Sequence, residues 1–168
     1  QKDHVFNSAE ATVKYFDLKE NTKALLCLSS EYIAGKMMLV RAMTAGWDLH
    51  TTAPEKNPLE NIDDTFDFSA MVPYQVFHSL KDLHKVKKLI VGGGAVSAEL
   101  DQQLQKIKTR VFATYGMTET ISHVAVRPIN GMEKSAVFSA LPKVDFSLNE
   151  NNCLQIHAPE ISEESIVT

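Results

Sequence analysis

Residues 115–120 read Tyr-Gly-Met-Thr-Glu-Thr and have the clearest chemical potential in the chain. The ring of Tyr115 can stack on a flat base, the hydroxyl of Thr118 can donate to a phosphate oxygen, and the carboxylate of Glu119 can ligate Mg²⁺. A turn that only reverses the chain does not need this ordered set of side chains. The hexapeptide therefore predicts an ATP site in which Thr118 and Glu119 are catalytic and Glu119 is the metal ligand.

A glycine triplet, Gly92-Gly93-Gly94, lies upstream of the hexapeptide and is followed by Ala95. Glycine lets the backbone approach a base or a phosphate without an intervening side chain, and the amide groups are donors. A tight turn between a strand and a helix is the alternative, and both remain open at this stage. The candidate nucleotide-binding residues are Gly92, Gly93, Gly94, Ala95, Tyr115, Gly116 and Met117.

The segment 33–45 has helical length and is almost apolar all round, which predicts a buried helix. Arg41 is one of only two charges on it, and Lys36 is the other. Burying an unpaired guanidinium is costly, so Arg41 should have an anionic partner. That partner is either a structural carboxylate, such as that of Asp48, or a carboxylate of a bound substrate.

These motifs must be positioned by elements that the apolar pattern also predicts. The expected strands are 23–28, 47–51, 66–71, 88–91 and 110–114. The expected helices are 8–16 with Ser8 as its cap, 33–45, 73–83 opened by Pro73, and one capped by Ser97 with Leu100, Leu104 and Ile107 on its apolar face. This order predicts an α/β fold with a mostly parallel sheet and helices on both faces. Ligands bind such sheets at the carboxyl ends of the strands, so the two motifs should face one ligand.

After Val124 the pattern changes to short runs at 124–129, 143–148 and 153–157. The last two are joined by an asparagine-rich loop, 149–152, which is typical of a hairpin. We therefore expect a small antiparallel element at the carboxyl end. The chain divides into an α/β ligand-binding subdomain, 1–123, and the start of a small β subdomain, 124–168.

Composition excludes several classes of protein. The chain has 168 residues, 44% of them hydrophobic and 23% charged, as in ordinary globular domains. A net charge of −4 argues against a nucleic-acid surface, and the one basic cluster, Lys85, Lys87 and Lys88, is interpreted as a solvated helix end or turn. The sequence has neither an apolar run of membrane-spanning length nor a secretory pattern at its start, so we expect a cytoplasmic protein.

The cysteines and histidines give no metal or redox motif. Cys27 and Cys153 are far apart and lie in apolar runs, so we interpret them as buried free thiols. His78 and His84 are six residues apart, a spacing that suits neither a helical ligand pair nor a zinc finger.

The glycine-rich segment and the hexapeptide closely resemble the adenylate-forming superfamily of acyl-CoA synthetases, peptide-synthetase adenylation domains and luciferases. The resemblance runs across most of the chain. In that family the glycine-rich turn lines the adenine pocket, the aromatic residue stacks on the base, the threonine binds phosphate and the glutamate binds magnesium. By this resemblance the roles fall on Gly93, Gly94, Ala95, Tyr115, Thr118 and Glu119.

Residues 29–42, Ser-Ser-Glu-Tyr-Ile-Ala-Gly-Lys-Met-Met-Leu-Val-Arg-Ala, resemble the strand-to-helix segment of o-succinylbenzoate–CoA ligases of menaquinone biosynthesis. In those enzymes an arginine follows the motif glycine by six positions, as Arg41 follows Gly35 here. Tyr32 stands where many relatives have a histidine. o-Succinylbenzoate is a dicarboxylate, so one acid could be activated while Arg41 or Lys36 holds the other. The resemblance thus implies a substrate-binding set of Tyr32, Gly35, Lys36 and Arg41.

The resemblance implies a two-step reaction that uses ATP, Mg²⁺ and coenzyme A. The acid attacks the α-phosphate of ATP, pyrophosphate leaves, and the thiol of coenzyme A then captures the acyl group from the acyl-adenylate. A ligase for another aryl or fatty acid, or a non-catalytic module that binds ATP or an adenylate, are the alternatives. The oligomeric state is left open, a homo-oligomer included.

Three parts of the family pattern fall outside the chain. The family's phosphate loop would precede Gln1, and its ribose-binding aspartate and a small domain with a catalytic lysine would follow Thr168. We therefore expect an incomplete fragment of a larger N-terminal domain of the acyl-CoA synthetase kind, inactive on its own.

Overall fold

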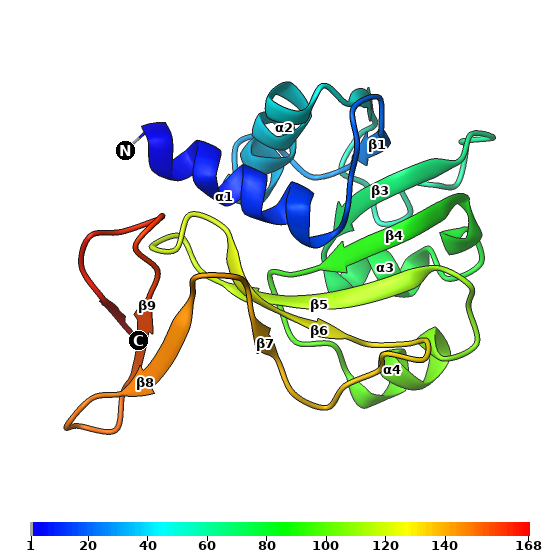
Figure 1. Cartoon of the computed structure of the whole chain (residues 1–168). Coiled ribbons are helices and arrows are strands. Elements are labelled where there is room, and N and C mark those ends of the chain that lie inside the picture. The colour runs from blue at the N-terminus through cyan, green and yellow to red at the C-terminus, as the bar shows by residue number, and fades with distance from the viewer. Residues whose placement is uncertain (1) are drawn as a thin grey trace.

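A seven-stranded, mostly parallel sheet forms the centre of the computed structural model, which describes residues 2–168 (Figure 1). Its strands are β1 (Lys23–Leu26), β2 (Asp48–Thr51), β3 (Phe66–Met71), β4 (Val86–Val91), β5 (Arg110–Gly116), β6 (His123–Pro128) and β7 (Ser139–Ala140). They lie in the order β2-β1-β3-β4-β5-β6-β7. The first five run parallel, and β6 and β7 extend one edge in the antiparallel sense. The prediction of a mostly parallel α/β sheet is confirmed.

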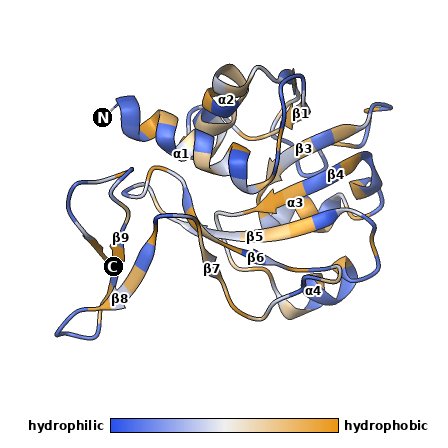
Figure 2. Ribbon diagram, viewed as in Figure 1, coloured by the Kyte–Doolittle hydropathy of each residue, from blue (hydrophilic) through white to orange (hydrophobic). Residues whose placement is uncertain are grey.

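Helices cover both faces of this sheet. In residues 2–168 they are α1 (Lys2–Tyr15), α2 (Ile33–Ala45), α3 (Pro73–His78), α4 (Ala98–Leu104) and a 3-10 helix, Leu83–Lys85. Side chains alternate along a strand, so each central strand contributes apolar side chains to the layers on both faces of the sheet. On β5, Phe112 packs in the layer of α1 and α2, whereas Val111 and Ala113 pack in the layer of α3 and α4. Figure 2 shows the apolar stretches of β4 and β5 between these layers.

A second, small sheet follows at the carboxyl end. It consists of β8 (Asp145–Leu148), β9 (Leu154–His157) and β10 (Ile166–Val167), all antiparallel. The predicted hairpin is confirmed: the Asn149 side chain accepts the amide hydrogens of Asn151 and Cys153, at 2.9 and 3.0 Å. Ile156 of β9 packs in one apolar cluster with Val124 of β6 and so joins the two sheets. The division of the chain at residues 123 and 124 stays a prediction.

The predicted first helix was too short. It was expected to begin after Ser8, but α1 begins at Lys2, and Ser8 is a buried residue in its middle. Asp3 lies in the first turn, where a negative charge favours the helix dipole, and α1 packs along α2. Tertiary packing thus extends the helix past a residue that is well suited to capping.

The predicted helix 73–83 is shorter in the structure and ends at His78. The amide of Ser79 bonds to the carbonyls of Gln75 and Val76, and the amides of Asp82 and Leu83 then bond to the carbonyl of Ser79. This turn places Leu83 in the core, fully buried. The burial of one leucine explains why the chain turns before the end of its helical pattern.

Two predictions of burial were wrong in part. α2 is not buried all round: Met43 is 75% exposed, because only one side of the helix faces α1 and the sheet. Cys153 is partly exposed, because it follows the hairpin loop of the small sheet, whereas Cys27 is fully buried as expected.

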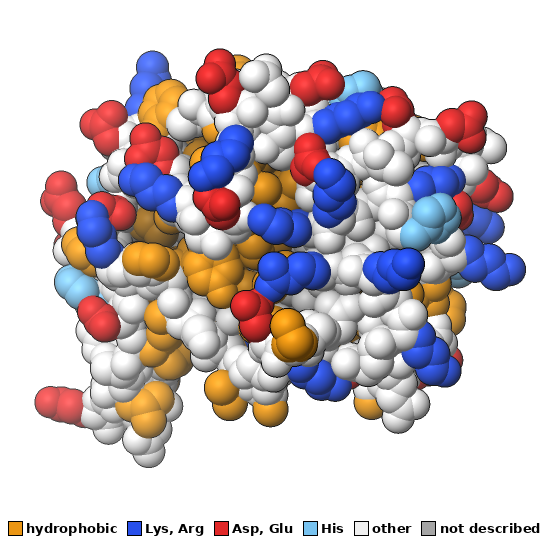
Figure 3. Space-filling model, turned by 45° about the vertical axis from the view of Figure 1, so that its right-hand side comes forward, with side chains coloured by type: hydrophobic (Ala, Val, Ile, Leu, Met, Phe, Trp, Pro, Cys, Tyr) orange, Lys and Arg blue, Asp and Glu red, His pale blue; other side chains and the backbone are white. Residues whose placement is uncertain are grey.

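The surface mixes charges of both signs. Acidic and basic side chains are interspersed over the face shown in Figure 3. In the described part of the chain, residues 2–168, no helix combines the length and the apolar character needed to cross a bilayer.

Candidate active site

A pocket of about 240 Å³ lies at the carboxyl ends of β3, β4 and β5. The amino-terminal part of α2 and the turn between β5 and β6 border it. Its wall is formed by Leu28, Ile33, Ala34, Met37, Arg41, Ala70, Met71, Val72, Ile90, Gly92, Gly93, Thr114, Gly116, Met117, Thr118, Ile121, Ser122 and His123. The glycine-rich segment, the hexapeptide and Arg41 all contribute to this wall, although they are far apart in the sequence.

Two glycines are required for the backbone to close around the pocket. A Cβ on Gly35 would lie 2.2 Å from the carbonyl oxygen of Ser29, so only glycine lets α2 start against the loop after β1. A Cβ on Gly116 would lie 2.4 Å from the carbonyl oxygen of Ser122, where the turn returns to β6. Both glycines thus shape the site through the backbone. Gly35 is not on the pocket wall.

The turn after β5 is organised by Thr120, which the sequence did not single out as a site residue. Its buried hydroxyl accepts the amide hydrogen of Met117 at 2.9 Å and lies 2.7 Å from the carbonyl oxygen of Ser122. Ile121 then has a φ of +63°, a left-handed conformation that is rare for a β-branched residue. Such strain persists only where surrounding contacts impose it, and here it delivers Ser122 to the pocket wall.

Arg41 is the buried cation of the pocket, only 2% exposed. Its Nη2 donates a short hydrogen bond to the hydroxyl of Ser122, and its Nε has no partner in residues 2–168. Burial lowers the pKa of Arg41 to about 10, so the guanidinium is still charged at neutral pH. Between residues 2 and 168, no acidic side chain forms an ion pair with it. The alternative that Asp48 is its structural partner was wrong, because Asp48 lies beside His50, at 3.2 Å.

His123 lies next to this group on the pocket wall. Its Nδ1 is 3.3 Å from the hydroxyl oxygen of Ser122, and its buried Nε2 has no partner in the described residues. Burial, and to a lesser degree the charge of Arg41, lower the pKa of His123 to about 3. His123 is therefore neutral at physiological pH, and Arg41 provides the positive charge of the pocket.

The other predicted substrate-binding residues lie off the wall. Tyr32 is 71% exposed just before α2, and Lys36 is exposed on the outer side of that helix. Of the two cations on α2, the structure thus places Arg41 in the pocket wall and Lys36 outside it.

Tyr115 lies on the other side of β5 from the pocket. Its neighbour Thr114 lines the pocket, whereas the half-buried ring of Tyr115 packs near Phe138 and Phe146, with centroids 6.3 Å from each. Gly94 and Ala95 are exposed and also lie off the pocket wall. The end of β5 therefore has an apolar pocket with one cation on one side and an aromatic surface on the other.

Thr118 and Glu119 are exposed at the tip of the turn, and Thr118 is part of the pocket wall. The carboxylate of Glu119 makes no hydrogen bond or ion pair with residues 2–168, so it is free to bind one ligand. No group of three or more His, Cys, Asp or Glu side chains in these residues could hold a metal ion. A metal here would have one protein ligand, which is how Mg²⁺ is commonly held when phosphates and water complete its shell.

The chain is similar to known ligases, although no family model matches it. It is 27% identical over 158 residues to the 2-succinylbenzoate–CoA ligase of Escherichia coli K12, a match that covers 93% of this chain and 34% of that enzyme. The chain thus spans about a third of the length of this curated relative.

Two solved structures have the same fold. The acyl-CoA synthetase (AMP-forming)/AMP-acid ligase II-like protein from Dyadobacter fermentans superimposes with a TM-score of 0.94 at 37% identity, over 100% of this chain and 50% of that one. Wild-type E. coli MenE, solved with a bound analogue of OSB-AMS, superimposes with a TM-score of 0.79 at 25% identity, over 97% of this chain and 36% of that one.

Proposed function

Because the chain belongs to the adenylate-forming superfamily, we propose that it is the nucleotide- and acid-binding part of an ATP-dependent acid–CoA ligase. The proposed acid is o-succinylbenzoate, the ligase forms its acyl-adenylate, and coenzyme A then takes the acyl group. The observation that supports this substrate most strongly is the buried guanidinium of Arg41, which has no acidic partner in the described residues.

The pocket has the chemistry of a site for an aromatic dicarboxylate. Most of its wall is apolar, which suits an aryl ring, and Arg41 offers the one full charge among its lining residues. A charge buried at this cost is expected to meet an anion during function. The second carboxylate of the substrate would occupy that place, and the first would point to the nucleotide.

The nucleotide would occupy the exposed edge formed by the glycine-rich segment and the turn. The ring of Tyr115 would stack on adenine, and the amides of Gly93, Gly94 and Ala95 would line the base. The hydroxyl of Thr118 would donate to a phosphate oxygen, and Glu119 would hold Mg²⁺. When bound, Mg²⁺ neutralises phosphate charge and so lowers the barrier to attack by the carboxylate.

A substrate panel tests this function in the full protein that contains the chain. We expect ATP-dependent consumption of coenzyme A with o-succinylbenzoate and far less with benzoate or a fatty acid. Arg41→Met should raise the KM for the dicarboxylate by at least about tenfold, since a charged hydrogen-bonded contact contributes about 1.5–3 kcal/mol. Lys36→Met is the matched control, because it removes a charge from the same helix outside the pocket.

The outcomes of the panel separate the alternatives. Equal turnover of monocarboxylic acids would identify a ligase for another acid, and ATP binding without turnover of any acid would identify a nucleotide-binding module. An unchanged KM in Arg41→Met would refute the role of that residue in the choice of acid.

A further inference from the structure

The ring of Tyr115 is held by a series of contacts that begins on α4. We propose that Phe138 and Arg127 are positioning residues of the nucleotide site, because they fix the ring on which the base of ATP would stack. This inference rests on the proposed function, which assigns the base to Tyr115.

The register of the sheet places these side chains on one face. Tyr115 on β5 lies opposite Ala125 on β6, and Ala125 lies opposite Ala140 on β7. Phe138 directly precedes β7, and its ring lies on the same face as the ring of Tyr115. The small side chain of Ala125 leaves room for the rings of Tyr115 and Phe138 to meet across β6. Their centroids are 6.3 Å apart and their planes cross at 62°, a favourable edge-to-face geometry.

Arg127 supports the ring of Phe138. The guanidinium carbon lies 5.6 Å from the ring centroid, and the side chain is only 18% exposed, so the cation–π contact is partly shielded from water. Nη1 of Arg127 also donates to the carbonyl oxygen of Ser135 at 3.4 Å. Phe138 is itself 45% exposed, so the contact with Arg127 helps to hold its ring in one orientation.

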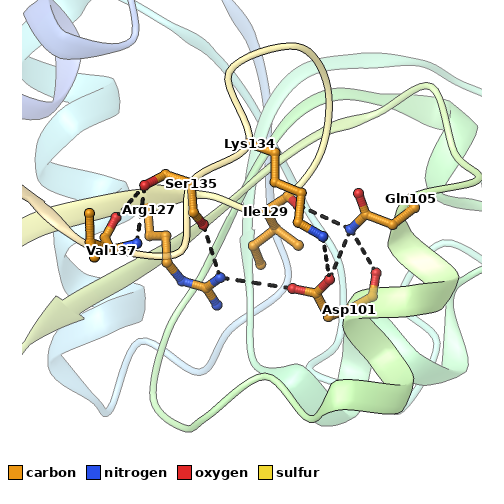
Figure 4. Close-up of polar contacts among 7 residues, drawn as sticks. All are labelled: Asp101, Gln105, Arg127, Ile129, Lys134, Ser135 and Val137. Carbon is orange, nitrogen blue, oxygen red and sulfur yellow. Dashed lines mark hydrogen bonds and ion pairs between the residues drawn. The ribbon is translucent and has the colours of Figure 1, made fainter.

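Asp101 of α4 fixes Arg127 in turn, as Figure 4 shows. Its Oδ2 lies 3.8 Å from Nη1 of Arg127, and its Oδ1 lies 3.0 Å from Nζ of Lys134. The same carboxylate thus holds both β6 and the loop that leads to Phe138. Because α4 begins at Ala98, shortly after the glycine-rich segment, one helix lies beside both parts of the proposed base site.

Calorimetric titration of the full protein with ATP tests the inference, alongside KM and kcat. Phe138→Ala should weaken ATP binding and raise the KM for ATP by roughly threefold to tenfold, the range of one aromatic pair, and leave the KM for the acid unchanged. Phe138→Tyr keeps the ring and should restore ATP affinity. Arg127→Met should change ATP affinity in the same direction as Phe138→Ala.

A matched control separates positioning from stability. Arg110 makes a similar cation–π contact with Phe112, at 5.4 Å, and pairs with Glu133, but has no contact with Tyr115. Arg110→Met should therefore leave ATP affinity unchanged. In a Tyr115→Leu background, Phe138→Ala should have no further effect on ATP affinity.

Two results would overturn the inference: unchanged ATP affinity in Phe138→Ala, or a loss that persists in full without the Tyr115 ring. Selective loss of ATP affinity in a protein that turns over no acid would refute the ligase and support the positioning role. Turnover of the acid together with an ATP affinity that Phe138→Ala leaves unchanged would support the ligase and refute the positioning role.

Discussion

The charge on Arg41 is buried in the pocket proposed to bind the acid, and burying a charge is expected to cost stability. The guanidinium is buried without an acidic partner in the described residues, and one of its nitrogens, Nε, lacks a hydrogen bond there. We predict that Arg41→Met raises the free energy of unfolding by about 1–3 kcal/mol, because it replaces a desolvated charge with an apolar side chain of similar length. Urea unfolding at pH 7.5 measures this, with Lys36→Met as the control that should change stability little. A less stable Arg41→Met variant would mean that the bond to Ser122 outweighs the cost of burial.

The two cysteines should differ sharply in reactivity. Burial raises the pKa of the Cys27 thiol to about 12, so almost no thiolate forms at neutral pH, and the side chain is closed to reagents. Cys153 is partly exposed in the small sheet. We predict that a maleimide or a disulfide reagent modifies one of these two thiols in the folded protein and both in urea, and mass spectrometry of peptides locates the first at Cys153. Rapid labelling of Cys27 in the folded state would contradict the packing of β1.

Arg41 also illustrates which properties of a single residue can be predicted from the sequence. A lone arginine in an apolar helix predicted a buried charge in need of an anion, and the burial is confirmed. The protein partner that it does have, Ser122, is 81 positions away in the chain and polar like many loop residues. No local pattern indicates that contact, because it depends on how α2 lies across the sheet.

Among the elements, α2 is the one whose placement defines the pocket. It can start where it does because Gly35 lacks a side chain next to the carbonyl of Ser29. We predict that Gly35→Ala lowers the free energy of unfolding by about 1–3 kcal/mol and weakens acid binding, because the added Cβ forces α2 away from the loop. Thermal unfolding measures the first effect and the KM for the acid the second.

Gly94→Ala is the matched control for stability. A Cβ there would lie 3.7 Å from Pro73, an ordinary contact, and its φ is not in the left-handed region. The variant should therefore unfold at nearly the same temperature as the parent protein. Equal destabilisation of the two variants would show that the close approach at Gly35 has no special importance.

Element types were easier to predict than element ends. Central strands such as β1, β3 and β4 follow from apolar runs that must be covered on both faces, whereas β7, a pair of exposed residues, has no such pattern and was not predicted. The ends of α1 and α3 depend on contacts outside each helix, at α2 and at Leu83, so capping and spacing rules alone misplaced them. Thr114 and Tyr115 lie on opposite faces of β5, and the strand pairing and the packing of α2 decide which of the two faces the pocket.

For the whole molecule, the fold couples stability to pH through His123. Its pKa falls from 6.5 to about 3 because the ring is buried beside Arg41, which is still charged over this range. In the unfolded chain His123 therefore binds a proton below about pH 6.5, whereas in the folded chain it stays neutral down to about pH 3. The stability that depends on a neutral His123 is fully present above about pH 6.5 and is lost as the pH falls from there toward about 3.

We predict that the free energy of unfolding falls more steeply on acidification in the parent protein than in His123→Gln. The difference should approach about 1.4 kcal/mol per pH unit between pH 6 and pH 4, the value for one proton. Urea unfolding at several pH values measures it. Carboxylates such as Asp67 and Asp82, whose pKa values are lowered by Lys87 and by Asn57, lose their contribution in acid in both proteins, so they cancel in the comparison. Parallel pH profiles would mean that His123 opens to water and takes up its proton without unfolding the site.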